Sequence, residues 1–212
     1  MAEQDSSMKF SNKNLDEIIQ ALRKKIILRI GIMGDKAQKE HEGSGLTNAQ
    51  LGAVHEFGAS INHPGGTPYR ITENGTAQFV SKEQGAGLPK TKPHTIEIPR
   101  RSFLLDPLQE KLNLTTDENK YLRKELFKRY FDDKAPEKFY KALETKALQI
   151  IDQAFMTNGY NKWTSLSQAY LKRKINSVKS KKKREEYAKN NKILVRSGDL
   201  KRSISGRIIK QQ

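Results

Sequence analysis

His55 and Glu56 are adjacent, and an imidazole beside a carboxylate is the arrangement in this sequence that most resembles a hydrolytic site. A zinc-peptidase helix carries two histidines four residues apart, so that both imidazoles lie on one helix face. Here Ala59 occupies the position of the second histidine. The remaining histidines fall in predicted loops or at a strand edge, at His41, His63 and His94. The spacing does not predict a metal site, and a metal-dependent hydrolase remains the less favoured alternative.

Other signals for enzyme chemistry are weak. The chain has no cysteine, which excludes a thiol nucleophile, a thiolate metal site and disulfide bonds. The glycine-rich stretch 61–69, INHPGGTPY, lacks the Lys-Ser/Thr pair of a phosphate-binding loop, and no nucleophile elbow is present. We therefore expect no enzyme activity, no cofactor and no bound metal ion, and a role in structure or binding.

Positive charge is the second strong feature of the sequence. The formal net charge is +16, and residues 172–192 contain ten lysines and arginines. Such a cluster can bind phosphate groups without reading bases. Alternatively the segment is a solvated helix or linker, because Glu185 and Glu186 interrupt it. The residues that could face DNA are Lys172, Arg173, Lys174, Lys181, Lys182, Lys183 and Arg184.

The hydropathy of the sequence predicts no membrane-spanning helix. No apolar run approaches the roughly 20 residues that cross a bilayer. The first ten residues lack the basic and apolar regions of a signal peptide. We expect a protein that is made in a cytosol and stays soluble.

The element predicted to carry His55 and Glu56 is a short helix. Thr47 and Gln50 form a capping-box pattern at its start. Gly58 suits its end, where a left-handed residue is often needed. We expect hydrogen bonds from His55 and Glu56 at this helix end, and Phe57 packed in the core.

Alternating apolar residues predict strands on both sides of this helix. Segment 24–34 is the clearest, and its predicted inward face consists of Ile26, Leu28, Ile30 and Ile32. Asn74-Gly75 predicts the turn of a hairpin within 69–82, and 94–99 alternates as a short strand. Polar and glycine-rich stretches predict loops at 35–46, 61–69 and 83–93.

Helical periodicity dominates the second half of the chain. Apolar residues recur at helical spacing over 136–156, and Asn158-Gly159 suits the end of that helix. A second capping-box pattern begins at Thr115. We expect Trp163 to be a packing anchor, and 193–210 to contain an extended piece, a turn and a last helix or strand.

These elements predict an α+β fold, with a small antiparallel sheet flanked by helices and a helical, basic C-terminal half. Residues 1–11 are expected to be a flexible leader. Residues 12–104 would form the α+β core, with loop insertions at 35–46 and 61–97. Residues 105–212 would be mainly helical, and they either pack on the same core or extend as an arm to a neighbouring subunit.

Three segments occur in an order that resembles a known family: IILRIGIMGD (26–35), TNAQLGAVHEFGASI (47–61) and IPRRSFL (98–104). Together they resemble the tail-completion and virion-morphogenesis proteins found at the neck of tailed bacteriophages. The C-terminal pieces WTSLSQAYLKRK (163–174) and ILVRSGDLKRSI (193–204) resemble the same group more loosely, because Tyr170 stands where the family often has threonine. The residues that carry the resemblance are His55, Glu56, Phe57, Gly58, Pro99, Arg101, Phe103, Trp163, Gly198 and Leu200.

The resemblance implies a structural virion protein that completes the tail or neck and joins the tail to the DNA-filled head. It implies a ring of copies, expected to be a hexamer, in contact with head-connector and tail-tube or tail-terminator proteins. A basic surface facing the passing genome would touch DNA without reading its sequence. His55 and Glu56 would then fix a turn, and Phe103 and Leu104 would pack on the strand face formed by residues 26–30. A standalone non-specific nucleic-acid-binding protein is the main alternative.

Overall fold

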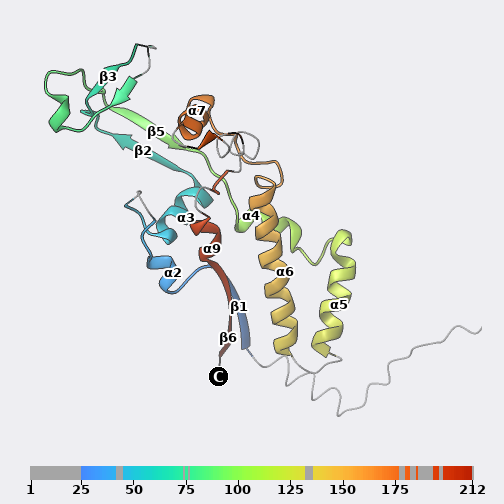
Figure 1. The fold of residues 1–212 in the computed structure, drawn as a ribbon. Helices are drawn as coiled ribbons and strands as arrows, with labels where there is room; N and C mark the ends of the chain where they lie inside the picture. Colours follow the sequence, from blue (N-terminus) through green and yellow to red (C-terminus); the bar gives the residue numbers. More distant parts are fainter. Residues whose placement is uncertain are drawn as a thin grey trace, which may run out of the picture.

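The computed structural model describes residues 25–41, 45–73, 75, 77–131, 136–176, 180–181, 185, 193–195 and 198–211 (Figure 1). The elements in chain order are β1 (Lys25–Ile32), α2 (Asp35–Gln38), α3 (Asn48–Phe57), β2 (Ala59–His63), β3 (Tyr69–Ile71), β4 (Ala77–Phe79), η1 (Glu83–Gly85), β5 (His94–Ile98), α4 (Leu105–Lys111), η2 (Asp117–Asn119), α5 (Lys120–Phe131), α6 (Pro136–Met156), α7 (Gln168–Asn176), α9 (Asp199–Ser203) and β6 (Ile204–Gln211). The predicted leader 1–11 lies outside the described residues.

The body of the protein is a two-stranded antiparallel sheet covered by α6. β1 and β6 pair along their whole length, from Lys25 opposite Gln211 to Ile32 opposite Ile204. Helix α6 contacts both strands, and a Cβ atom at Gly206 would overlap the side chain of Glu144 on α6. A residue without a side chain at this position of β6 therefore lets the helix lie close to the sheet.

Both halves of the chain contribute to one hydrophobic core. Its fully buried members include Phe103 and Phe155, whose ring centroids are 5.3 Å apart. Ile30 and Ile32 of β1 pack against this cluster. The buried cluster consists of Phe103, Ile151, Phe155, Trp163, Ile193 and Leu200. Phe103 thus packs mainly against residues of the C-terminal half, which lies on the core and not apart from it.

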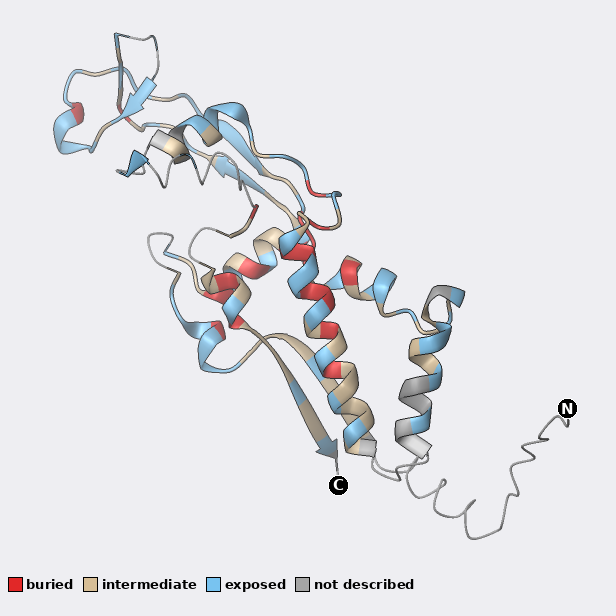
Figure 2. Ribbon diagram, turned by 45° about the vertical axis from the view of Figure 1, so that its right-hand side comes forward, coloured by how far each residue is buried: buried red, intermediate tan, exposed pale blue. Residues whose placement is uncertain are grey.

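A β-ribbon arm projects from the body. Strand β2 pairs antiparallel with β5, and the shorter hairpin β3–β4 lies at the far end (Figures 1 and 2). One face of β2–β5 is polar and internally hydrogen-bonded, through Ser60 with Glu97 and Thr95 with Asn62. On the other face Ile61 lies directly opposite Ile96, and both are exposed. The arm therefore presents an apolar strip to solvent.

Two loop predictions were wrong because strand and helix signals were hidden by turn-forming residues. Segment 61–97 was expected to be a loop insertion, but it contains most of the arm, since β2 extends to His63 and pairs with β5. Segment 35–46 was also expected to be a loop, but Asp35–Gln38 forms the short helix α2. The hairpin predicted within 69–82 is present as β3–β4.

Phe57 was expected in the core, and this prediction was wrong. Its side chain is 67% exposed. The buried positions of α3 are Asn48, Gly52 and Glu56, which recur every four residues and so lie on one face. Phe57 follows Glu56 by about 100° around the helix and therefore points away from that face.

The predicted α+β class is confirmed: helices combine with small antiparallel two-stranded sheets in the described part of the chain. The predicted capping box at Thr47 is also present, with Thr47 and Gln50 exchanging side-chain-to-backbone hydrogen bonds. A second capping box was expected between Thr115 and Glu118; the Thr115 hydroxyl donates to Asn113, and the side chain of Glu118 lies outside the described part of the structure. Among the described residues, no helix is both long and apolar enough to cross a membrane.

The two phenylalanines give a direct test of this core. Phe103→Ala should lower the free energy of unfolding by about 3–5 kcal/mol, because it removes a fully buried ring from the cluster. Phe57→Ala should change it by less than about 0.5 kcal/mol, because that ring is mostly in water. Urea unfolding followed by circular dichroism measures both. A larger loss for Phe57→Ala than for Phe103→Ala would contradict the described packing.

Candidate functional site

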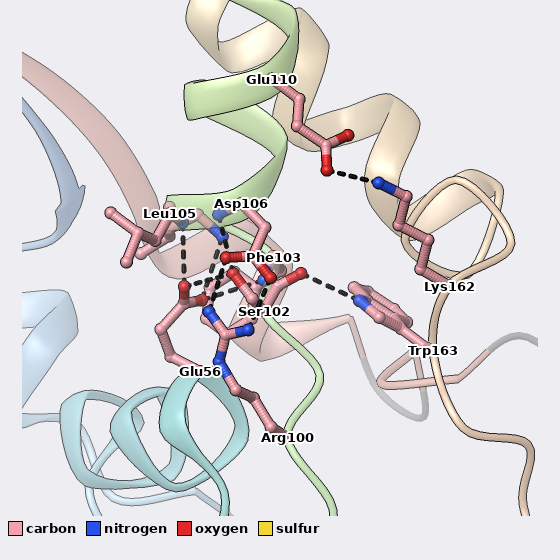
Figure 3. Close-up of polar contacts among 10 residues, drawn as sticks. Glu56, Arg100, Ser102, Phe103, Leu105, Asp106, Glu110, Lys162 and Trp163 are labelled. Atoms are coloured by element: carbon pink, nitrogen blue, oxygen red, sulfur yellow. Dashed lines mark hydrogen bonds and ion pairs between the residues drawn. The ribbon is translucent and has the colours of Figure 1, made fainter.

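The carboxylate of Glu56 is the centre of the polar site. Glu56 is buried, and its two oxygens accept four hydrogen bonds from residues 102–105 (Figure 3). Oε1 accepts from the Ser102 hydroxyl at 2.5 Å and from the Leu105 backbone N–H at 2.9 Å. Oε2 accepts from the N–H groups of Phe103 and Leu104 at 2.9 and 3.0 Å. A side chain of α3 therefore caps the start of α4 and satisfies N–H groups that the helix cannot pair itself.

Ser102 connects this cap to two further segments. Its hydroxyl donates to Glu56 and accepts from the Asp106 N–H at 3.0 Å. Its carbonyl accepts from the indole N–H of Trp163 at 2.9 Å, and this bond is buried. At the surface, Arg100 makes a bidentate ion pair with Asp106 at 2.6 and 2.7 Å. The 100–106 turn is thus attached to α3 and to the segment that follows α6.

The rest of the H-E-F-G motif shapes the backbone. The carbonyl of His55 accepts a hydrogen bond from the Arg101 N–H at 2.7 Å. Gly58 has φ 78° and ψ 168°, so it is not in the left-handed helical region that we expected. It lies in a region that only glycine occupies readily. A Cβ atom there would be 3.1 Å from the Ile98 carbonyl oxygen and 3.2 Å from the Arg100 nitrogen. The motif therefore holds residues 98–101, where the chain leaves β5, against the end of α3.

The contacts of the adjacent imidazole and carboxylate differ. Both oxygens of Glu56 accept hydrogen bonds in the cap, whereas the buried Nδ1 atom of His55 has no hydrogen-bond partner among the residues that the structure describes. His63 and His94 stack on each other in the arm, with ring centroids 5.0 Å apart. Within the described residues, no group of three or more potential metal ligands converges.

His55 instead lines a pocket of about 710 Å³ between the arm root, α7 and the 193–195 segment. That volume is in the range of ligand sites, about 300–1,000 Å³. The pocket walls are largely apolar and include Leu51, Ile96, Ile98, Leu166, Leu194 and Val195. Nothing in the sequence pattern indicated this pocket, because its walls come from segments far apart in the chain.

A buried guanidinium forms the charged part of the pocket. Arg101 is 7% exposed, and its Nε donates to the Thr164 carbonyl at 3.1 Å. No carboxylate pairs with it among the described residues. Burial lowers the pKa of Arg101. The pKa of His55 is lowered from 6.5 to about 4, mainly by burial and then by the nearby charges of Arg101 and His41.

The other predicted site residues fall into three places. Pro99 lines the pocket, while Phe103, Trp163 and Leu200 are core residues. Gly198 begins α9 in the left-handed conformation, with φ 78° and ψ 2°. Of the basic residues expected to face DNA, Lys172 and Lys181 are exposed. Arg173 and Lys174 lie in α7, and Lys182, Lys183 and Arg184 lie outside the described residues.

The chain was compared with known proteins by sequence and by structure. No protein-family model, no curated protein and no solved structure matches it.

The cap can be tested by removing the carboxylate. Glu56→Ala should lower the free energy of unfolding by about 3–5 kcal/mol, because it leaves several buried donors without an acceptor. Glu97→Ala is the matched control, since it also removes a serine–glutamate hydrogen bond, but at an exposed position in the arm. Its cost should stay below about 1 kcal/mol. Equal costs in urea unfolding would show that Glu56 is not a structural cap.

The buried imidazole makes a separate prediction about pH. The unfolded chain takes up a proton on His55 near pH 6.5, whereas the folded chain does so only near pH 4. The contribution of His55 to stability is therefore present above about pH 6.5 and decreases as the pH falls towards 4. His55→Gln should flatten the stability difference between pH 7 and pH 4.5, as measured by urea unfolding at both pH values. An unchanged pH profile in His55→Gln would contradict the low pKa.

Proposed function

We propose that this chain is a structural component of a tailed-phage virion, which completes the tail or neck and joins the tail to the DNA-filled head as part of a ring. The observation that carries the proposal is the contact between two motif segments. Glu56 of H-E-F-G accepts hydrogen bonds from the N–H groups that follow P-R-R-S. The residues that resemble the family motif thus stabilise one another through hydrogen bonds, which is the role expected of motif residues in a structural protein.

The exposed apolar surface favours an assembly role. Large apolar side chains that monomeric proteins usually bury are open to solvent at the end of α3 and along the arm. They are Phe57, Ile61, Ile71, Phe79 and Ile96. Most of the arm is coloured as exposed in Figure 2. A projecting apolar arm on a compact body supplies contacts for neighbouring subunits, and a ring at the junction of head and tail would use them.

Non-specific nucleic-acid binding is supported by a different observation. Arg29 and Arg207 lie directly opposite each other on β1 and β6, and both are exposed. Like charges at opposed positions repel each other, and neither arginine has an ion-pair partner among the described residues. An anionic backbone would relieve this repulsion. Such contacts are compatible with a neck protein past which DNA travels, and also with a standalone DNA-binding protein.

The decisive experiment is electron microscopy of lysates from a phage or prophage that lacks only this gene. We expect DNA-filled heads beside separate tails, or tails of abnormal length. A plasmid carrying the wild-type gene should restore joined virions, while the same plasmid with an early stop codon should not. Normal joined virions without the gene would contradict the proposal and would favour the nucleic-acid-binding alternative.

A further inference from the structure

The pocket at the arm root contains a charge that needs a counter-ion. Arg101 is 7% exposed, and among the described residues its side chain makes one hydrogen bond, to a backbone carbonyl. A buried ion is costly unless it is paired. The two imidazoles that share the pocket, His41 and His55, cannot supply negative charge. Of the acidic residues that line the pocket, Glu97 accepts a hydrogen bond from Ser60 and Asp199 accepts one from Arg202.

The pocket chemistry defines the group that would fill it. A carboxylate would pair with the guanidinium of Arg101, and apolar side chains beside it would cover the walls formed by Ile96, Leu166 and Val195. The complementary feature is a short segment that carries an acidic residue between large apolar residues. Ile96 is 41% exposed, so part of this wall is open to an incoming chain.

The far end of the arm carries such a segment. In the β3–β4 hairpin, Ile71 is 61% exposed and Phe79 is 56% exposed. Glu73, in the turn between these strands, is exposed and has no ion-pair partner among the described residues. In both ribbon views this hairpin lies at the end of the arm that is distant from the body, so it does not fold back onto the pocket of its own chain (Figures 1 and 2).

We propose that the pocket beside Arg101 receives the β3–β4 hairpin of a second copy of this chain, with Glu73 paired to Arg101 and with Ile71 and Phe79 on the apolar wall. The proposal deepens the proposed function, because it rests on assembly into a ring and names the two surfaces that join. Charge complementarity selects the occupant: the hairpin turn offers the carboxylate of Glu73, and the pocket offers the guanidinium of Arg101, which has no paired carboxylate among the described residues.

The geometry of this contact has a consequence for the assembly. The hairpin and the pocket are different surfaces of the chain, so they can join copies head to tail, and the proposal takes this heterologous arrangement because a ring requires it. Each copy would use its arm on one neighbour and its pocket on the other. Repetition of such a contact gives a closed ring when the rotation between copies closes, and a filament otherwise.

The test uses the full chain and exposed positions, so that folding is not at risk. Phe79→Ser changes the hairpin, Ile96→Ser changes the pocket wall, and Glu73→Gln removes the charge. Tyr121→Ser on α5 is the matched control, because Tyr121 is 76% exposed and lies away from the arm. Native mass spectrometry and analytical ultracentrifugation measure self-association. Each interface variant should raise the dissociation constant at least about tenfold, and the control should not.

Mixing variants separates the head-to-tail contact from a symmetric one. Phe79→Ser keeps an intact pocket, and Ile96→Ser keeps an intact hairpin. An equimolar mixture should therefore form 1:1 dimers, although neither variant associates alone. Dimers in the mixture support the proposal. If both variants lose association alone and the mixture forms no dimers, the interface is symmetric and the proposal is overturned.

Two further outcomes also overturn it. If Phe79→Ser and Ile96→Ser associate as the wild type does, other surfaces join the copies. If the wild type stays monomeric at every concentration reached, a second copy is not the occupant. Neither result bears on the lysate microscopy, so the proposed function stands or falls separately from this interface.

Discussion

The fold depends on one buried carboxylate. Glu56 replaces water for four donors at the start of α4, and it can do so only if α3 ends where the 102–105 backbone begins its helix. A buried carboxylate is stable when its hydrogen bonds are complete, and costly when they are not. This requirement fixes the arm root as well, because Gly58 and β2 follow immediately after α3. Ser102 extends the constraint to Trp163 and so to the hydrophobic core.

Because of this cap, the structure separates into a closed body and an open arm. In the body, Phe103 and Phe155 are fully buried, and the donors of residues 102–105 are hydrogen-bonded to Glu56. In the arm, the Ser60–Glu97 and Thr95–Asn62 hydrogen bonds lie on one face, while Ile61 and Ile96 leave the other face apolar and exposed. A well-packed body and an arm with an exposed apolar face are the features expected of a subunit in a larger assembly. The proposed role at the phage neck follows from this division and from the motif resemblance.

Local signals in the sequence predicted much of the fold. The alternation of Ile26, Leu28, Ile30 and Ile32, the capping box at Thr47 and the Asn-Gly turn each depend on neighbouring residues alone. Strand β2 was missed because its pairing with β5 joins residues more than thirty positions apart, and turn-forming residues follow it directly. Phe57 was misplaced because apolar residues were expected inside. The buried face of α3 instead uses Gly52 and Glu56, whose burial depends on distant partners. No local pattern marked Arg101 as a buried cation.

The most direct test of the account is a cryo-electron microscopy reconstruction of the neck of particles whose genome encodes this chain. The account predicts a ring of copies at the junction of head and tail, with Glu56 buried against residues 102–105 in each copy and with the arms in contact with neighbouring subunits. Purified particles that lack the chain, or a neck in which the arms extend freely into solvent, would contradict it.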